Sequence, residues 1–217
     1  MITTRLIEKA IGESEDQHFG FTGQLLAIHQ LVYENNQPKV EKVVLDNANG
    51  KAVVYFPIAG EKFHLAIYLK TTPDISVTWV DTVPYHRLCF RATSTTLNYE
   101  QLCTMTTLQP GNGWNKGDLM KNGKAAFKFS CIELYAVEGP GKFEEKLDAL
   151  LDLLEQDSKG ISALATNANG YIQATISFHN GNTMLGGPAI CKENIRRMSA
   201  LQLGIDFDLY ADGNFYL

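Results

Sequence analysis

Apolar residues follow two different periods along the chain, and the change between them divides the sequence into two parts. Over residues 2–11 they recur at helical spacing, which predicts a short amphipathic helix ending at Gly12. From Gln24 onward they occur in short β-favouring runs, separated by turn residues such as Asn-Gly and Pro. The runs predict an antiparallel meander of five strands: 24–34, 39–46, 51–58, 62–70 and 75–83.

From His86 onward, helical and strand periods alternate. The predicted strands are 87–94, 126–136, 171–179 and 205–210, and the predicted helices are 98–106, 142–156, 159–168 and 191–202. The order β-α-β-α-α-β-α-β suits a ferredoxin-like unit with helices on one face of the sheet. We therefore predict an α+β protein with two domains, a helix and five-strand antiparallel meander over residues 1–85 and an α+β domain over 86–217.

Composition and charge narrow the classes of partner. The 217 residues are 45% apolar and 20% charged, which is typical of a globular domain. The net charge of −5 disfavours a nucleic-acid partner, because neutralising a phosphate backbone requires a basic face. No run reaches the roughly 18 apolar residues of a membrane span, and the N-terminus has no apolar signal segment. We therefore predict a cytoplasmic protein without a nucleic-acid or membrane partner.

The cysteines and histidines show no spacing that suits a metal or a redox centre. Cys89, Cys103, Cys131 and Cys191 lack the paired spacing of a zinc site or dithiol, which predicts buried free thiols in a reducing compartment. The five histidines are scattered, without the i,i+4 pair of a helical zinc site. We predict no metal, no cofactor and no catalytic residue.

The stretch "LQPGNGWNKGD" at 108–118 is the segment most similar to a phosphate-binding loop. A P-loop requires Gly-Lys-Ser/Thr, but here Lys116 precedes Gly117 and Asp118 follows, which would repel phosphate. We interpret the stretch as a structural turn in which Trp114 buries its ring against an apolar surface.

Asp206 and Asp208 form a second candidate, because the alternation of a strand places both side chains on one face. Two such acids serve as acid and base when their pKa values are pushed apart. The alternative is the solvated face of an edge strand.

The helix at 142–156 separates apolar from acidic residues into two stripes. The acidic stripe consists of Glu144, Glu145, Asp148, Asp152 and Glu155. Like charges at i,i+3 and i,i+4 cost about 0.2–0.5 kcal/mol each, so the stripe predicts a surface kept for a cationic partner.

Two other interpretations of the acidic stripe stay open. In the first interpretation, the acidic stripe is only a solvated surface that keeps the protein soluble. In the second, the helix at 191–202 neutralises part of it, through Lys192, Arg196 or Arg197, if the two helices pack side by side.

The second half of the chain resembles the bacterial domain-of-unknown-function family 4279. The segments that carry the resemblance, over about residues 86–213, are "RLCFRATSTTLNYEQLCTMTTLQPGNGWNKGD", "FKFSCIELY", "FEEKLDALLDLLE", "YIQATISF" and "NIRRMSALQLGIDFDLYADG". The sequence departs from the family pattern at Phe127 and Phe129, where the strand after the loop would contain a tryptophan. Residues 1–85 lie outside the resemblance, and the family carries over no catalytic residue.

Small α+β proteins of this kind often lie near polymorphic-toxin loci, so the resemblance implies an immunity-type role by association. We expect a non-enzymatic cytosolic binding protein that occludes a cognate toxin with a basic surface, using the acidic stripe. One alternative is a hydrolase or transferase assembled from distant residues such as Asp206, Asp208 and a histidine. The other is a small-ligand sensor with an apolar cavity in the meander. The sequence does not indicate an oligomeric state.

Overall fold

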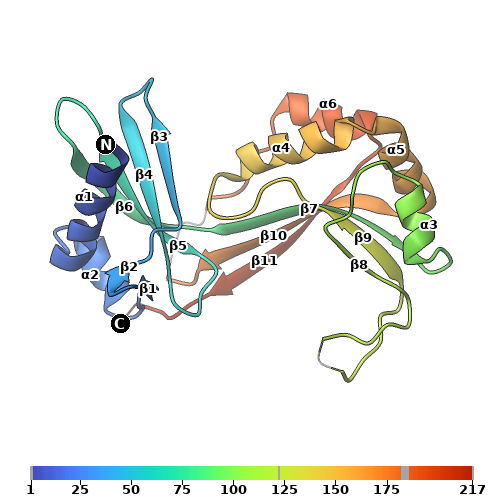
Figure 1. Cartoon of the computed structure of the whole chain (residues 1–217), viewed down its shortest axis with the longest axis horizontal. Helices are drawn as coiled ribbons and strands as arrows, with labels where there is room; N and C mark the ends of the chain where they lie inside the picture. The colour runs from blue at the N-terminus through green and yellow to red at the C-terminus, as the bar shows by residue number, and fades with distance from the viewer. Residues whose placement is uncertain (1, 122, 182–185, 217) are drawn as a thin grey trace.

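A computed structural model describes residues 2–121, 123–181 and 186–216. Within these ranges the chain forms two units, each built on one β-sheet with helices on one of its faces (Figure 1). The chain therefore belongs to the α+β class that the sequence predicts.

The first unit packs two helices against a four-stranded antiparallel sheet of order β3-β4-β5-β6. Its core contains the alternate strand residues that face the helices, such as Val54, Phe56 and Ile67, together with Leu6 and Leu25. A separate two-stranded ladder precedes this sheet. The elements are α1 (Ile2–Asp16), α2 (Gly20–Leu26), β1 (Tyr33–Glu34), β2 (Gln37–Pro38), β3 (Lys42–Asp46), β4 (Lys51–Pro57), β5 (His64–Lys70) and β6 (Ser76–Val83).

Two predictions for the first unit are wrong. The helix α1 continues past Gly12 to Asp16, and the predicted strand at 24–34 is replaced by α2 and β1, so the sheet has four strands. The buried carboxylate of Glu13 on α1 explains both, because it accepts hydrogen bonds from Phe19 N at 3.0 Å and Thr22 Oγ1 at 2.7 Å. The beginning of α2 is thus satisfied by a side chain from another helix.

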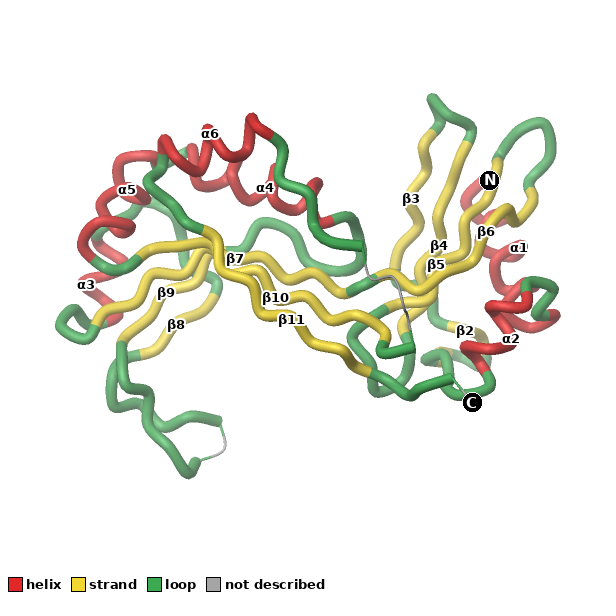
Figure 2. Tube along the Cα trace, turned by 180° about the vertical axis from the view of Figure 1, so that it is seen from behind, coloured by secondary structure: helices red, strands yellow, loops and turns green. Residues whose placement is uncertain are grey.

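The second unit has a five-stranded sheet of order β11-β10-β7-β9-β8, in which β10 and β11 are parallel and the other pairs antiparallel. The helices cover one face, where they bury one apolar cluster with the sheet (Figure 2). The elements are β7 (Tyr85–Ser94), α3 (Tyr99–Thr104), β8 (Asn112–Trp114), β9 (Ser130–Leu134), α4 (Phe143–Glu155), α5 (Ser158–Asn167), β10 (Gly170–His179), α6 (Lys192–Ala200) and β11 (Ile205–Asp212).

The predicted helices of the second unit are confirmed, and β8 is an additional strand inside the predicted turn. The ferredoxin-like arrangement stays a prediction. Gly113 is required in β8, because a Cβ there would lie 2.3 Å from the Tyr99 ring and 2.6 Å from the carbonyl oxygen of Cys131. After β8 the chain makes a narrow hairpin, bridged at Leu119 and Ala126, that projects from the body (Figure 2).

The two units are joined by the chain itself and by hydrogen bonds between them. Pro84 alone separates β6 from β7, and the tail after β11 returns to the first unit, where Asn214 Nδ2 donates to the carbonyl oxygen of Ile28 at 2.9 Å. Lys42 Nζ on β3 also donates to the carbonyl oxygen of Pro140 at 2.8 Å. None of the helices in the described ranges is long and apolar enough to cross a bilayer.

Candidate functional site

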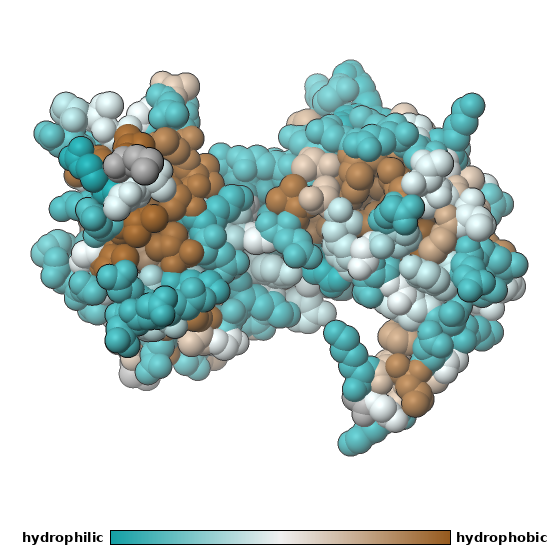
Figure 3. Space-filling view, viewed as in Figure 1, coloured by the Kyte–Doolittle hydropathy of each residue, from teal (hydrophilic) through white to brown (hydrophobic). Residues whose placement is uncertain are grey.

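A cleft of about 1100 Å³ lies between the two units. One wall is the helix-free face of the four-stranded sheet, and the other is formed by the first turn of α4 with the chain around Gly141 and Pro188. In the space-filling view the molecule is notched between the units, with apolar surface on both sides (Figure 3). We take this cleft as the candidate site, because binding sites are typically concave and combine apolar walls with a few polar groups.

The sheet wall exposes a row of apolar side chains. Strand register aligns Val44, Val53, Tyr68 and Trp79 across β3, β4, β5 and β6, on the face opposite the helices. Trp79 is 59% exposed and Val44 is 37% exposed. Among the residues that the structure describes, these four neighbouring apolar side chains form a patch that no helix covers.

The α4 wall is charged. Glu144 and Glu145 line the cleft beside Phe143, and Lys142, at the N-cap position, makes no side-chain capping hydrogen bond. Lys142 Nζ lies 3.7 Å from the Glu145 carboxylate, while Glu144 Oε1 accepts from the backbone N–H of Ala189 at 3.0 Å. Both carboxylates sit in the first turn, where the helix dipole favours negative charge.

A buried lysine on α4 holds this helix in place behind the cleft. Lys146 is 3% exposed, and its Nζ donates to the carbonyl oxygens of His86, at 2.5 Å, and Gly139. Burial and the neighbouring Lys42 lower the pKa of Lys146 to about 8. Lys146 thus ties α4 to the beginning of β7 and fixes the position of the charged wall relative to that strand.

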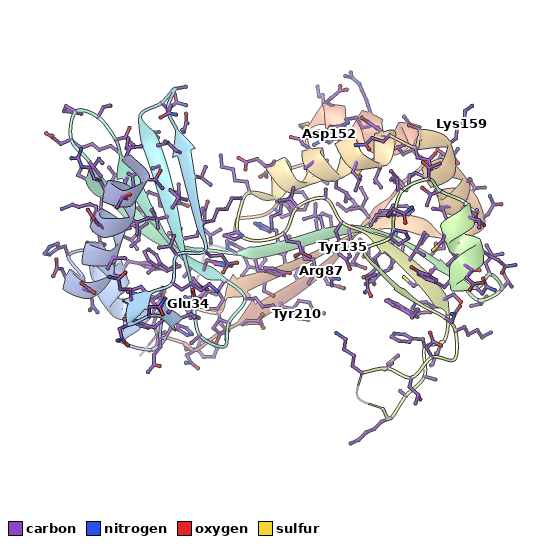
Figure 4. All side chains as sticks on the ribbon, viewed as in Figure 1. Glu34, Arg87, Tyr135, Asp152, Lys159 and Tyr210 are labelled. Carbon is purple, nitrogen blue, oxygen red and sulfur yellow. The ribbon has the colours of Figure 1, made fainter. Side chains whose placement is uncertain are left out.

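The predicted acidic stripe is partly neutralised by α6, as one of the sequence interpretations allows. Arg197 Nη2 lies 2.6 Å from Asp152 Oδ1, and Arg197 Nε lies 2.7 Å from Glu155 Oε1. Asn194 Nδ2 donates to Asp148 Oδ1 at 2.8 Å. Hydrogen bonds to Glu155 and Asp152 raise the pKa of Arg197. Figure 4 shows Asp152 on the outer side of α4, next to α6. The stripe therefore divides: Glu144 and Glu145 line the cleft, whereas the other carboxylates contact α6.

The secondary candidates lie on the helix-free face of the five-stranded sheet. Asp206 and Asp208 are exposed on the edge strand β11, and Gln173 Nε2 donates to Asp208 Oδ2 at 3.2 Å. Trp114 is half-buried and stacks on Phe127, with ring centroids 4.4 Å apart. These contacts place the two acids in solvent and Trp114 in an aromatic cluster near the opposite edge.

Sequence reasoning missed a buried ion cluster on this same face. Glu133 is 1% exposed and accepts hydrogen bonds from Arg91 Nε at 2.9 Å and Asn112 Nδ2 at 2.9 Å, as well as from Arg87 and Tyr135. Burial raises the pKa of Glu133, but the hydrogen bonds from Tyr135, Asn112 and Arg91 outweigh burial. The pKa of Glu133 therefore stays below its ordinary value. Figure 4 shows Arg87 and Tyr135 on the side away from α4 and α6. The sequence signal that could have revealed this cluster is a glutamate within the otherwise apolar strand "SCIELYA".

The cysteines are free thiols, but only some are buried. Cys89 and Cys131 are buried, Cys103 is half-buried, and Cys191 is exposed, so the prediction of buried thiols is wrong for Cys191. Burial raises the pKa of Cys89 to about 11 and that of Cys131 to about 12, which keeps both protonated and unreactive near neutral pH.

Fold and site together define a two-sheet α+β protein with a cleft between its units, and comparison with known proteins gives its family. A family model described as "Domain of unknown function (DUF4279)" matches residues 84–212. The match covers more than half of the 217 residues, so the chain belongs to this family, as its sequence resemblance predicts. No curated protein and no solved structure matches the chain.

Proposed function

We propose that this protein is a non-enzymatic binding protein that takes a segment of a partner protein into the cleft between its units. The observation that carries the proposal is the uncovered apolar row on the four-stranded sheet, above all the 59% exposed Trp79. Exposed tryptophan and tyrosine next to a cavity are the side chains that most often dominate binding energy at protein interfaces. An apolar side chain of the partner would bury Trp79 and Tyr68 together.

Charge next to the cleft supports a partner with a basic surface. Glu144 and Glu145 line the cleft, and Asp148, one turn further along α4, is 55% exposed. Arg197 is already engaged with Asp152 and Glu155, so a cation of the partner gains less from these two. Lysines of both walls also reach the cleft, and charge therefore contributes orientation and association rate more than net attraction.

In its most specific form, the proposal is a cytoplasmic immunity protein that binds and occludes a cognate bacterial toxin. Only the association of such α+β proteins with toxin loci supports this form, whereas the cleft supports the wider class of protein binding. A stable complex would bury roughly 1,600 Å² in total. The cleft and the exposed first half of α4 would be its centre.

The test is binding of the protein encoded next to this chain's gene, measured by calorimetry at two salt concentrations. We expect Trp79→Ser to weaken binding at least about tenfold, as the loss of a hot-spot side chain does. The double variant Glu144→Lys, Glu145→Lys should weaken binding and flatten its salt dependence.

Two matched controls accompany these variants. Leu119→Ser removes a 71% exposed apolar side chain from the projecting hairpin, and Asp206→Lys reverses an exposed charge on β11. Both should bind as the parent does. If the cleft variants also bind as the parent does, the cleft is not the interface.

The cleft also favours a second candidate function, small-ligand binding. Its volume of about 1100 Å³ is at the upper end of ligand sites, and Tyr55 and Tyr68 line it beside apolar groups. A thermal-shift screen tests this candidate. A ligand of the cleft should raise the melting temperature of the parent but not of a Trp79→Ser variant, and a shift that persists in the variant would place the ligand elsewhere.

A further inference from the structure

Two buried histidines are in contact where the two units join, next to the segment that follows β11. His29 follows α2 in the first unit and His179 ends β10 in the second, and they are 6% and 1% exposed. Their Nε2 atoms lie 3.2 Å apart, and His179 Nε2 lies 3.1 Å from the backbone carbonyl oxygen of Asn214. Three electron-pair donors from distant parts of the chain therefore converge.

The two contacts of His179 Nε2 compete for hydrogens. A neutral imidazole carries one N–H, so a hydrogen on His179 Nε2 would have to serve both His29 Nε2 and the Asn214 carbonyl. A hydrogen on His29 Nε2 instead leaves His179 Nε2 and the carbonyl oxygen as two facing acceptors. Protonating both histidines would direct two N–H groups at each other in a buried place.

The same distances fit a tetrahedral metal ion. Zinc binds imidazole nitrogen at about 2.0–2.1 Å, so neighbouring ligand atoms of a tetrahedral site lie about 3.3 Å apart. The separations of 3.2 Å and 3.1 Å around His179 Nε2 are close to this edge length. We propose that His29, His179 and the Asn214 carbonyl bind one divalent transition-metal ion of the zinc class, with water at the fourth position.

The surroundings orient the ligands for this role. Glu61 Oε1 lies 4.0 Å from His29 Nδ1, which favours the tautomer with hydrogen on Nδ1 and leaves the Nε2 lone pair facing His179. Burial lowers the pKa of His29, although the charge of Glu61 opposes this, and a neutral ring is the form that binds metal. The rings of Phe63 and Tyr216 lie 4.9 and 5.0 Å from the His179 ring and shield the site from solvent.

The tail is shaped to bring its carbonyl to this point. Gly213 has a φ of +90°, and a Cβ there would lie 2.9 Å from the Phe63 ring, so glycine is the residue that fits. No group of three His, Cys, Asp or Glu side chains in the described ranges could hold a metal, and the proposed site therefore depends on this backbone oxygen. Its affinity should be below that of a four-side-chain structural zinc site. The ion would link the first unit, β10 and the tail.

The experiment titrates tag-free protein, first stripped with EDTA, with zinc chloride and nickel chloride by calorimetry in a non-chelating buffer. We expect one ion per chain and a melting temperature raised by about 5–10 °C when free metal exceeds its Kd a hundredfold. His29→Gln and His179→Gln should each abolish both effects. His18→Gln, which alters an exposed histidine, and Cys191→Ser, which removes the exposed thiol, should change neither.

A measurement on the unaltered protein covers the case in which a histidine variant does not fold. In nitrogen NMR spectra of the imidazole rings, zinc should shift the Nε2 resonances of two histidines and leave the other three unchanged. The proposal is overturned if the parent protein binds no ion stoichiometrically, or if binding persists in folded His29→Gln. Binding lost in His18→Gln or Cys191→Ser would likewise overturn it, as an adventitious surface site.

Discussion

The two sheets of this protein each leave one face without helices, and they treat that face differently. On the five-stranded sheet, Glu133 is surrounded by Arg87 and Arg91, and Trp114 stacks on Phe127, so the polar and aromatic groups satisfy one another. On the four-stranded sheet, the apolar row around Trp79 has no such cover from residues 2–121, 123–181 or 186–216. The first face carries mainly polar groups that pair with one another, with Tyr210 on β11 48% exposed, whereas the apolar row of the second face loses free energy to solvent exposure until something covers it. The difference between the two helix-free faces points to the four-stranded sheet as the binding surface, which the net charge of the chain does not do.

The largest expected effect is on the helix-free face of the five-stranded sheet. Glu133→Ala leaves two arginines of the cluster without their carboxylate, and we expect it to lower the free energy of unfolding by about 3 kcal/mol. Urea unfolding measures this change. The control Asp208→Ala removes an exposed carboxylate and should change stability by less than about 0.5 kcal/mol. Equal losses in both variants would show that the cluster does not stabilise the face.

The second prediction concerns Lys146, a buried cation that donates to two carbonyl oxygens and lies over the Tyr85 ring, where Glu133 has guanidinium groups. Its pKa is lowered from 10.5 to about 8 in the fold, so between these values the unfolded chain binds more protons and stability rises with pH. The contribution should be on the order of 2–3 kcal/mol. Lys146→Met lacks this group and should lack the rise.

The measurement is the difference in unfolding free energy between the parent and Lys146→Met, followed from pH 7 to pH 10. The difference is needed because the raised pKa values of Cys89 and Cys131 have the opposite sign. Their thiols ionise first in the unfolded chain, so the thiol contribution to stability falls above about pH 8.5 equally in both proteins. A difference that stays flat with pH would mean that Lys146 titrates normally.

A smaller effect is expected for Trp114→Ala, because the ring is half-buried and stacks mainly on Phe127. We expect a loss of about 2 kcal/mol, below the range for a fully buried tryptophan. Differential scanning calorimetry would measure it. Lys116→Ala is the control, because its Nζ makes only an exposed 3.3 Å contact with the carbonyl oxygen of Thr95. A larger loss for Lys116→Ala than for Trp114→Ala would contradict the structural interpretation of this turn.

The smallest effect on stability is expected on the open face. Trp79→Ser should change the free energy of unfolding by no more than about 0.5 kcal/mol, because the side chain is 59% exposed. A loss of more than about 2 kcal/mol would mean that Trp79 stabilises the free protein, and the contrast between the two faces would fail. Urea unfolding under the same conditions as for Glu133→Ala makes the two faces directly comparable.

Elements with a strong local period could be predicted from the sequence, and those that depend on distant partners could not. The helix predicted at 142–156 is observed at Phe143–Glu155, because its leucines repeat at helical spacing and bury one stripe. The strand predicted at 24–34 is wrong because α2 has only seven residues, too few to show a period, and Glu13 of another helix holds its N-cap residue Phe19 and the Thr22 hydroxyl.

The candidate site illustrates the same division. The acidic stripe on α4 follows from spacing alone, but its partial neutralisation depends on how α6 places Arg197. The apolar row requires the register of four strands, which brings Val44 level with Trp79. His29 and His179 are separated by 150 positions, and no local pattern connects them.

The links between the two units limit how far the cleft can change its width. One link is Pro84, whose ring fixes φ near −65° and leaves little slack between β6 and β7. Another is the tail, held through Asn214 to the first unit. The hydrogen bond from Lys42 Nζ to the carbonyl oxygen of Pro140 is a third link, and it lies beside the cleft. A partner entering the cleft would therefore meet two walls whose separation is held at three places before it binds.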